Sequence, residues 1–294
     1  MFNFEDLRPI SNYPKYPPYV KDDNGYLESF FFNYYINNKK IFDDKDRTLL
    51  PIWWTTLAVD NVQLPIQKYI DVLPSNIKWF TVSQLDDGIK FKLPPNTLHF
   101  AAGGLGGGIP IPLICSPIPK LDCVVDSTGE QREIDLSKSI FCSFVGSVTH
   151  PIRQKIIDYN KNQTLIKNTF FLPKNQWSQH VSDNHLQDFQ VVTQASQFAL
   201  APRGYGLSSF RLYEIMQLGA IPVYVSDKHW LPFTDELDWN EFCVLLGEKD
   251  IPNLYEILLN ISPEKQERMF QKGKEVYESH FTLESVCKQI LKRL

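Results

Sequence analysis

The chain has 294 residues, and its 30 lysines and arginines against 34 aspartates and glutamates give a formal net charge of −4. This length suffices for two domains that each bury a hydrophobic core, and 43% of the residues are hydrophobic. Scattered charge close to balance argues against the basic surfaces with which proteins bind nucleic acids or anionic membranes.

The first part of the chain predicts an α/β layer. The residues up to Asn24 are rich in proline and tyrosine, and we expect them to form an irregular arm. Leu27 to Asn37 carries aromatic residues at helical spacing and predicts a helix. Lys78 to Ser83 and Thr97 to Ala102 are rich in aromatic and β-branched residues and predict strands.

A change of composition between Ser116 and Ser139 indicates a domain boundary, since prolines there give way to charged and turn residues. We expect residues 1–130 to form an N-terminal α/β domain and residues 131–275 a C-terminal one. Residues 276–294 are expected to form a helix that packs back toward the N-terminal domain.

Strands and helices alternate regularly after this boundary. Strands are expected at residues 140–145, 169–172, 197–201, 221–225 and 243–245. Helices are expected at residues 151–160, 183–195 and 208–218, and from about residues 253 and 263. This alternation predicts a doubly wound parallel sheet.

The most informative segment follows the predicted strand that ends at Pro202. It reads Arg-Gly-Tyr-Gly-Leu-Ser-Ser-Phe-Arg-Leu-Tyr-Glu from Arg203 to Glu214. Its glycines let a ligand approach the backbone, and Ser208 and Ser209 stand where the cap of the next helix is expected. Because the N–H groups and positive dipole end of a helix N-terminus attract anions, the segment predicts a phosphate site.

Charged side chains flank this turn. Arg203 and Arg211 can each form two hydrogen bonds to phosphate oxygens, and Glu214 can accept hydrogen bonds from a ribose diol. The alternative is an ordinary capped helix with an Arg211–Glu214 surface pair. A second loop, Ser226 to Phe233, also follows a predicted strand, and ligands of open α/β sheets bind at such ends.

These segments resemble the exostosin-like glycosyltransferases. The resemblance rests on the turn from Pro202 to Glu214, on Gly-Ala-Ile-Pro-Val-Tyr-Val-Ser-Asp from Gly219, and on Phe-Val-Gly-Ser-Val-Thr-His-Pro-Ile-Arg from Phe144. It extends in order over roughly residues 138–259 and is faint before Ser116.

The resemblance implies two Rossmann-like domains that face a cleft, the GT-B architecture. The activity that it implies is an inverting, metal-independent transfer from a UDP-sugar to a carbohydrate hydroxyl, with no cofactor. The partners would be a nucleotide-sugar donor and a glycan acceptor. Two alternatives stay open: a GDP-sugar (fucosyl-type) transferase on the same fold, and a catalytically inactive carbohydrate-binding module.

The resemblance also implies which residues meet the nucleotide sugar. Arg203, Ser208, Ser209 and Arg211 would meet the diphosphate, and Glu214 the ribose. The remaining residues expected to line the site are Gly146, Ser147, Arg153, Gly204, Tyr205 and Gly206. Arginines and helix N–H groups can stabilise a departing diphosphate without a metal.

Inversion needs a general base on the acceptor side. Asp86 and Asp87, which follow the predicted strand ending at Ser83, are the first candidates, and His99 is the next. An ordinary Asp-Gly turn and a structural histidine are the alternatives. Asp60 is a weaker third candidate.

Three other motifs are less informative. Gly103 to Gly108 misses the dinucleotide fingerprint and predicts either a cleft wall or a flexible loop. Asp44-Lys-Asp46 matches the D-x-D of metal-dependent glycosyltransferases but lies in a polar run, so we interpret it as a solvated charge cluster. His180 and His185 lie in a polar loop, where we expect no metal site.

Three features indicate the compartment. The N-terminus lacks the basic and apolar stretches of a signal peptide, and no apolar run reaches the ~18 residues of a membrane-spanning helix. Five widely spaced cysteines predict buried free thiols rather than a disulfide between Cys115 and Cys123. Secretory-pathway members commonly carry a cysteine where this chain has Phe198 to Ala201. We expect a soluble cytoplasmic enzyme, or a Golgi enzyme if the chain is a fragment.

Overall fold

The computed structural model describes residues 25–59, 66–125, 131–133, 137–175 and 181–294. Contacts divide the chain into two compact units, unit 1 and unit 2. Unit 1 holds the described residues up to Ser116 together with Trp230–Phe233 and His280–Leu294, and unit 2 holds Pro117–His229 and Thr234–Ser279.

Unit 1 is built on a parallel sheet with the strand order β1-β2-β3-β4. The strands are β1 (Thr48–Leu49), β2 (Trp79–Ser83), β3 (Leu98–Ala101) and β4 (Ile109–Pro110). The helices are α1 (Leu27–Asn37), α2 (Lys39–Asp43), α3 (Trp54–Val59), α4 (Ile66–Asp71) and α10 (Leu283–Lys292), which follows the π-helical turn η4 (Tyr277–Phe281). The helix expected at Leu27 to Asn37 and both expected strands are confirmed.

Aromatic side chains form the centre of unit 1. All five residues of β2 are buried, so this strand carries a continuous apolar run rather than an alternating one. The rings of Phe31 on α1, Phe42 and Phe80 lie about 6 Å apart, with centroid distances of 6.0 and 6.3 Å. Helix α1 packs on β2 and on α10.

Unit 2 contains a parallel sheet with the strand order β11-β10-β9-β7-β8. The strands are β7 (Ile140–Ser147), β8 (Thr169–Lys174), β9 (Ser196–Pro202), β10 (Ile221–Val225) and β11 (Val244–Leu246), with a separate hairpin of β5 (Cys123–Val125) and β6 (Gln131–Glu133). The helices are α5 (Pro151–Asn162), α6 (Asp183–Gln194), α7 (Phe210–Leu218), α8 (Leu254–Leu259), α9 (Pro263–Val276), η2 (Trp239–Glu241) and η3 (Glu248–Asn253).

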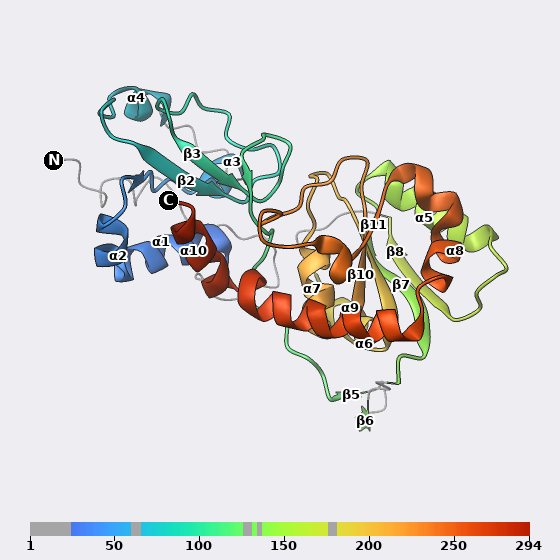
Figure 1. Ribbon diagram of the computed structural model, residues 1–294. Helices are drawn as coiled ribbons and strands as arrows, with labels where there is room; N and C mark the ends of the chain where they lie inside the picture. Colours follow the sequence, from blue (N-terminus) through green and yellow to red (C-terminus); the bar gives the residue numbers. More distant parts are fainter. Residues whose placement is uncertain (1–24, 60–65, 126–130, 134–136, 176–180) are drawn as a thin grey trace. The chain divides into compact units, whose positions relative to one another are not determined.

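The sheet of unit 2 is doubly wound. Its five strands follow the order 2-1-3-4-5 when numbered along the chain, and helices cover both faces, with α6, α7 and α9 on one side and α5 and α8 on the other (Figure 1). The order reverses between β7 and β9, and ligands of such sheets bind at the carboxyl ends of the strands at this switch point. The expected α/β class and doubly wound sheet are confirmed.

Lys138 forms hydrogen bonds with the C-terminal ends of two helices of unit 2. Its ammonium donates to the carbonyl oxygen of Gln194 at 2.8 Å and to that of Gly219, the residues at which α6 and α7 end. Gly219 has a φ of +84°, a conformation that favours glycine at the end of a helix. The lysine and the glycine together stabilise the C-terminal end of α7.

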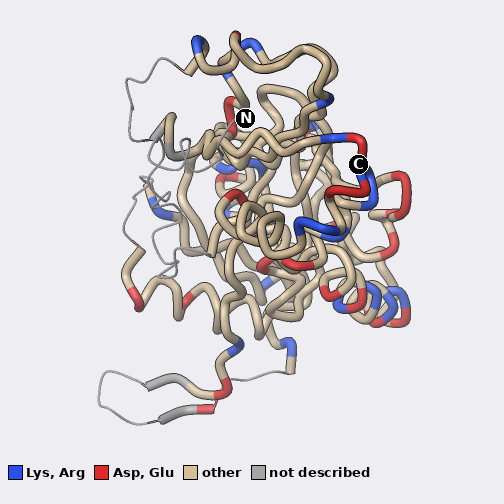
Figure 2. Tube along the Cα trace, turned by 90° about the vertical axis from the view of Figure 1, so that its left-hand side faces the viewer, with Lys and Arg blue, Asp and Glu red and all other residues tan. Residues whose placement is uncertain are grey.

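The charge pattern and the cysteines follow the sequence analysis in most respects. Figure 2 shows positions of Lys and Arg interspersed with those of Asp and Glu along the described trace. All five cysteines are free thiols, four of them buried, whereas Cys123 is exposed. Within the described ranges, no helix has the length and apolar character needed to cross a bilayer.

Candidate functional site

Two loops of unit 2 meet at the switch point, one after β7 and one after β9, and Arg153 on α5 ties them together. Its Nε donates to the carbonyl oxygen of Arg203 at 2.9 Å, its Nη2 to that of Pro202 at 2.9 Å and its Nη1 to that of Ser147 at 2.7 Å. The guanidinium of Arg153 is therefore committed to the backbone of both loops. Arg153 therefore shapes the two loops near the expected diphosphate site.

The glycines of these loops differ in how tightly they are packed. A Cβ at Gly204 would lie 3.2 Å from Nη2 of Arg153 and 3.3 Å from Oγ1 of Thr149, whereas one at Gly146 would come no closer than 3.6 Å to any atom. Gly204 thus lets the loop after β9 pass over the Arg153 guanidinium. Gly206 is buried and Tyr205 is 60% exposed.

Arg203 links the loop after β9 to the end of β10. Its Nη1 donates to Oδ1 of Asp227 at 2.6 Å, and its Nη2 donates to the carbonyl oxygen of Tyr205 at 2.9 Å. The hydrogen bond from Arg203 lowers the pKa of the Asp227 carboxyl below its ordinary value. Arg203 itself is buried, while 48% of the Asp227 side chain is exposed.

The N-terminus of α7 is not closed by its own serines. Ser209 occupies the cap position with extended backbone, but its side chain makes no capping hydrogen bond within the described structure. Ser208 is only 3% exposed, and its Oγ has no hydrogen-bond partner among the described residues. A buried hydroxyl in this state is costly and is the exception in folded proteins, which makes the start of α7 a candidate position for a ligand.

Arg211 is the second residue of α7, and three contacts hold its side chain. Its Nη1 donates to Oε2 of Glu214 at 2.5 Å, its Nε donates to the carbonyl oxygen of Val145 at 3.2 Å, and its guanidinium lies 3.6 Å from the ring centroid of Phe189. Glu214 is 5% exposed. The Arg211–Glu214 pair is therefore a built part of the switch point rather than a surface pair.

Two cationic or basic side chains at this edge were not among the predicted site residues. Lys174 ends β8, and its pKa is lowered by burial and by the nearby Arg211 charge. His150 precedes α5, and its Nδ1 accepts a hydrogen bond from the backbone N–H of Ile152 at 3.3 Å. The sequence does contain a signal for His150, since Pro151 marks the first turn of a helix and so places residue 150 at its cap.

In unit 1, the candidate bases lie in the loop after β2 and within β3. Asp86 and Asp87 are half-buried in the loop after β2, and Asp87 pairs with Lys90 at 2.9 Å. His99 lies in β3 with its Nε2 2.7 Å from Oγ of Ser83, and burial lowers the pKa of the imidazole to about 4. The role of each as a base stays a prediction.

The glycine-rich segment packs against the Asp86 loop. The N–H of Leu105 donates to the carbonyl oxygen of Asp86 at 3.0 Å. A Cβ at Gly103 would lie 2.2 Å from Cα of Asp86, and one at Gly106 would lie 2.5 Å from Cα of Gly88. These glycines are required because two backbones approach closely, which argues against a flexible loop. The expected cleft wall stays a prediction.

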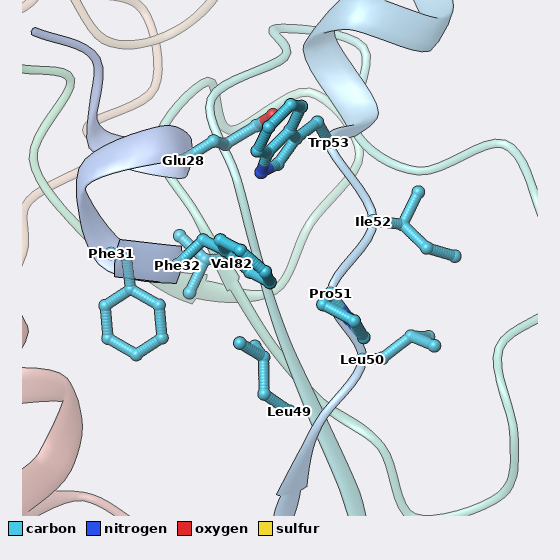
Figure 3. Close-up of a pocket in the computed structure, with 9 residues that line it drawn as sticks. All are labelled: Glu28, Phe31, Phe32, Leu49, Leu50, Pro51, Ile52, Trp53 and Val82. Atoms are coloured by element: carbon cyan, nitrogen blue, oxygen red, sulfur yellow. The ribbon is translucent and has the colours of Figure 1, made fainter. Parts of the chain in front are cut away.

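Unit 1 also contains a buried carboxylate that sequence reasoning missed. Glu28 on α1 accepts hydrogen bonds from the backbone N–H of Gln84 and from Oγ1 of Thr55, both at 2.7 Å. Burial raises the pKa of Glu28 to about 7, against the opposing effect of these hydrogen bonds. Glu28 and Trp53 both line a small pocket whose other lining residues are apolar (Figure 3).

The remaining candidate residues are Asp46, Asp60 and His180. Asp46 of the D-x-D segment forms an exposed ion pair with Lys78, as expected of a solvated cluster. Asp60 and His180 lie outside the described residues. Among the residues that are described, no group of three His, Cys, Asp or Glu side chains is placed to hold a metal ion.

Comparison with known proteins identifies the relatives. Residues 108–261, just over half of the chain, match the family described as the Exostosin GT47 domain. "Probable glycosyltransferase At5g03795" of Arabidopsis thaliana is 30% identical over 154 residues, which cover 52% of this chain and 27% of that protein. "Exostosin-1 homolog" of Caenorhabditis elegans is 29% identical over 114 residues, which cover 36% and 30%.

A third relative has a higher sequence identity over a shorter segment. "Probable glucuronosyltransferase GUT1" of Oryza sativa subsp. japonica is 38% identical over 84 residues, which cover 29% of this chain and 20% of that protein. The alignments span less than a third of the length of these relatives. The solved "Crystal Structure of TarM" aligns with 77% of this chain and 57% of its own at 9% identity, with a TM-score of 0.37, too weak a likeness to carry an argument.

Proposed function

The chain belongs to the Exostosin GT47 domain family, and from this premise we propose that it is a glycosyltransferase. The reaction that we propose transfers a sugar from a UDP-sugar to a hydroxyl group of a carbohydrate acceptor. Unit 2 binds the nucleotide sugar and unit 1 supplies the acceptor side, as in the GT-B architecture. The names of the relatives, two of which are glycosyl- or glucuronosyltransferases, support this reaction class.

One observation carries the proposal: a buried hydroxyl at the start of α7 makes no hydrogen bond within the described structure. The buried Ser208 Oγ lacks a hydrogen-bond partner in the described structure, the first N–H groups of α7 lie beside it, and Arg211 follows. All of these lie where the strand order reverses between β7 and β9. A diphosphate there accepts hydrogen bonds from the hydroxyl and the helix N–H groups.

Arg211 supplies the fixed positive charge of the proposed reaction. Breaking the bond between the sugar and the diphosphate leaves negative charge on the departing nucleotide. Because Phe189 and Glu214 already hold the Arg211 guanidinium, stabilising that charge requires little rearrangement. Lys174, whose pKa Arg211 lowers, adds a second cation at the same edge.

Glu214 and Arg203 keep the roles expected for them. Glu214, held by Arg211, is the proposed acceptor for the ribose hydroxyls. Arg203 reaches the diphosphate when a phosphate oxygen competes with the half-exposed Asp227 carboxylate for its Nη1.

We propose inversion at the anomeric carbon, without a metal, with Asp86 or Asp87 as the general base. An imidazole whose pKa burial lowers to about 4 is a weak base, and His99 is also engaged by Ser83. The loop of Asp86 and Asp87 is held by the glycine-rich wall, which gives the carboxylates a defined position.

Turnover with a panel of UDP-sugars and oligosaccharide acceptors tests the proposal. We expect one UDP-sugar to be consumed with formation of UDP and a new glycoside of inverted anomeric configuration. Stabilisation against heat by GDP and not by UDP would favour the fucosyl-type alternative. Glycan binding with neither transfer nor nucleotide binding would contradict the enzyme and leave a carbohydrate-binding module.

A further inference from the structure

His150 is placed at the same switch point by its position before α5. It ends the loop after β7, whose Ser147 carbonyl is bonded to Arg153, and Arg153 also holds the loop after β9. Thr149, the neighbour of His150, lies within 3.3 Å of the position that a Cβ on Gly204 would take. His150 is thus the last residue of one of the two loops that meet at the proposed diphosphate site.

The helix cap defines which ring nitrogen of His150 carries the proton. Nδ1 accepts the backbone N–H of Ile152 at 3.3 Å, and a nitrogen that accepts a hydrogen bond carries no proton. The proton of the neutral ring is therefore on Nε2, the nitrogen on the far side from the cap. No partner for Nε2 is present among the described residues.

The charges around His150 favour the neutral ring. Arg153 on α5 and Arg203 after β9 oppose its protonation, and Asp227 after β10 and Glu248 on η3 favour it. Burial is the largest influence, and together these groups lower the pKa of His150 below its ordinary value. Protonation of Nδ1 would also break the cap of α5. The same arrangement, a neutral histidine at a helix N-terminus, serves as a hydrogen-bond donor in other enzymes.

We propose that His150 donates a hydrogen bond from Nε2 to the diphosphate of the donor substrate, so that it contacts the leaving group directly. This inference rests on the proposed function and adds a neutral donor to the cations Arg203, Arg211 and Lys174.

Two substitutions separate this role from capping, because each keeps one nitrogen's function. Asn is a good helix cap, so His150→Asn keeps the bond to Ile152 and loses the Nε2 donor. His150→Gln places an amide donor near the position of Nε2 and loses the cap. His280→Asn is the control for a histidine substitution outside unit 2.

We measure UDP affinity by calorimetry and the thermal midpoint of each variant. The expected result is that His150→Asn keeps its midpoint and binds UDP about tenfold more weakly, while His150→Gln loses stability and keeps most of the affinity. The ratio of wild-type to His150→Asn affinity should stay constant from pH 7.5 to pH 9, since a ring whose pKa lies below its ordinary value is neutral in that range.

The reverse order, with UDP affinity kept by His150→Asn and lost by His150→Gln, would show that His150 acts only as a cap and would overturn the inference alone. An affinity ratio that rises as the pH falls would show a charged imidazolium and overturn the neutral donor. If the wild type binds neither UDP nor GDP, the proposed function fails and the inference fails with it.

Discussion

Single residues at the switch point are arranged for a ligand rather than for the fold alone. Arg153 and Arg211 are both anchored by several contacts, but Ser208 is a buried hydroxyl without a partner in the described structure. Folded proteins rarely leave such a group unpaired, and those that do often use it in function. Substitutions of anchored and of unpaired side chains should therefore differ in their effects on stability and on ligand binding.

Ser208→Ala should leave stability unchanged or raise it, because the substitution removes a hydroxyl that has lost its water partners and gained none. The same change should weaken UDP binding, by about tenfold if one hydrogen bond to a phosphate is lost. Denaturant unfolding and calorimetry check the two effects.

Ser226→Ala is the matched control. Ser226 is as deeply buried, but its Oγ donates to the carbonyl oxygen of Lys228 at 2.6 Å. This variant should lose about 1 kcal/mol of stability. A similar loss of stability in Ser208→Ala would mean that the Ser208 hydroxyl serves the fold.

At the scale of elements, glycines mark where loops must touch and where they need not. Gly106 lets the glycine-rich segment cross the backbone at Gly88. A Cβ at Gly146, near the end of β7, would instead meet its neighbours at ordinary van der Waals distances. Only the first is required by packing.

Gly106→Ala should therefore destabilise the protein by about 2 kcal/mol or more, because its Cβ would lie 2.5 Å from the Cα of Gly88. Gly146→Ala should be neutral or slightly stabilising, since alanine restricts the unfolded chain at no cost in contacts. Unfolding free energies of the two variants check this order. Equal losses would contradict the packing argument.

Glu28 joins three elements of unit 1, since it lies on α1 and accepts hydrogen bonds from Thr55 on α3 and from Gln84 after β2. Burial raises its pKa from 4.5 to about 7, so the folded state binds this proton more tightly than the unfolded state. The resulting stabilisation is complete below pH 4.5 and is lost as the pH rises through about 7.

Glu28→Gln should accordingly flatten the dependence of stability on pH between about 5 and 8, because the amide does not titrate. Unfolding free energies at several pH values for wild type and variant check this. Parallel curves for the two proteins would show that the carboxylate does not titrate in this range.

For the whole molecule, the sequence predicted unit 2 better than unit 1. The strands and helices of unit 2 follow from local signals: apolar runs, glycine turns and Pro151 at a helix start. The segment from Arg203 to Glu214 was predicted for the same reason, because its chemistry lies within one turn and one helix.

What could not be predicted depends on residues far apart in the chain. The Arg153 guanidinium meets carbonyl groups some 50 residues away, and Glu28 and Gln84 are separated by 56 residues. The membership of Trp230–Phe233 in unit 1 likewise arises from tertiary contacts. The near-neutral net charge of the chain gave no indication of the cations gathered at the switch point.

Hydrogen–deuterium exchange with and without UDP tests the central claim most directly, namely that unit 2 binds a nucleoside diphosphate at the start of α7. The account predicts slower exchange of the backbone amides of residues 208–212 and of the loop after β7, because phosphate oxygens accept hydrogen bonds there. Binding of UDP with protection elsewhere, and none at these amides, would contradict it.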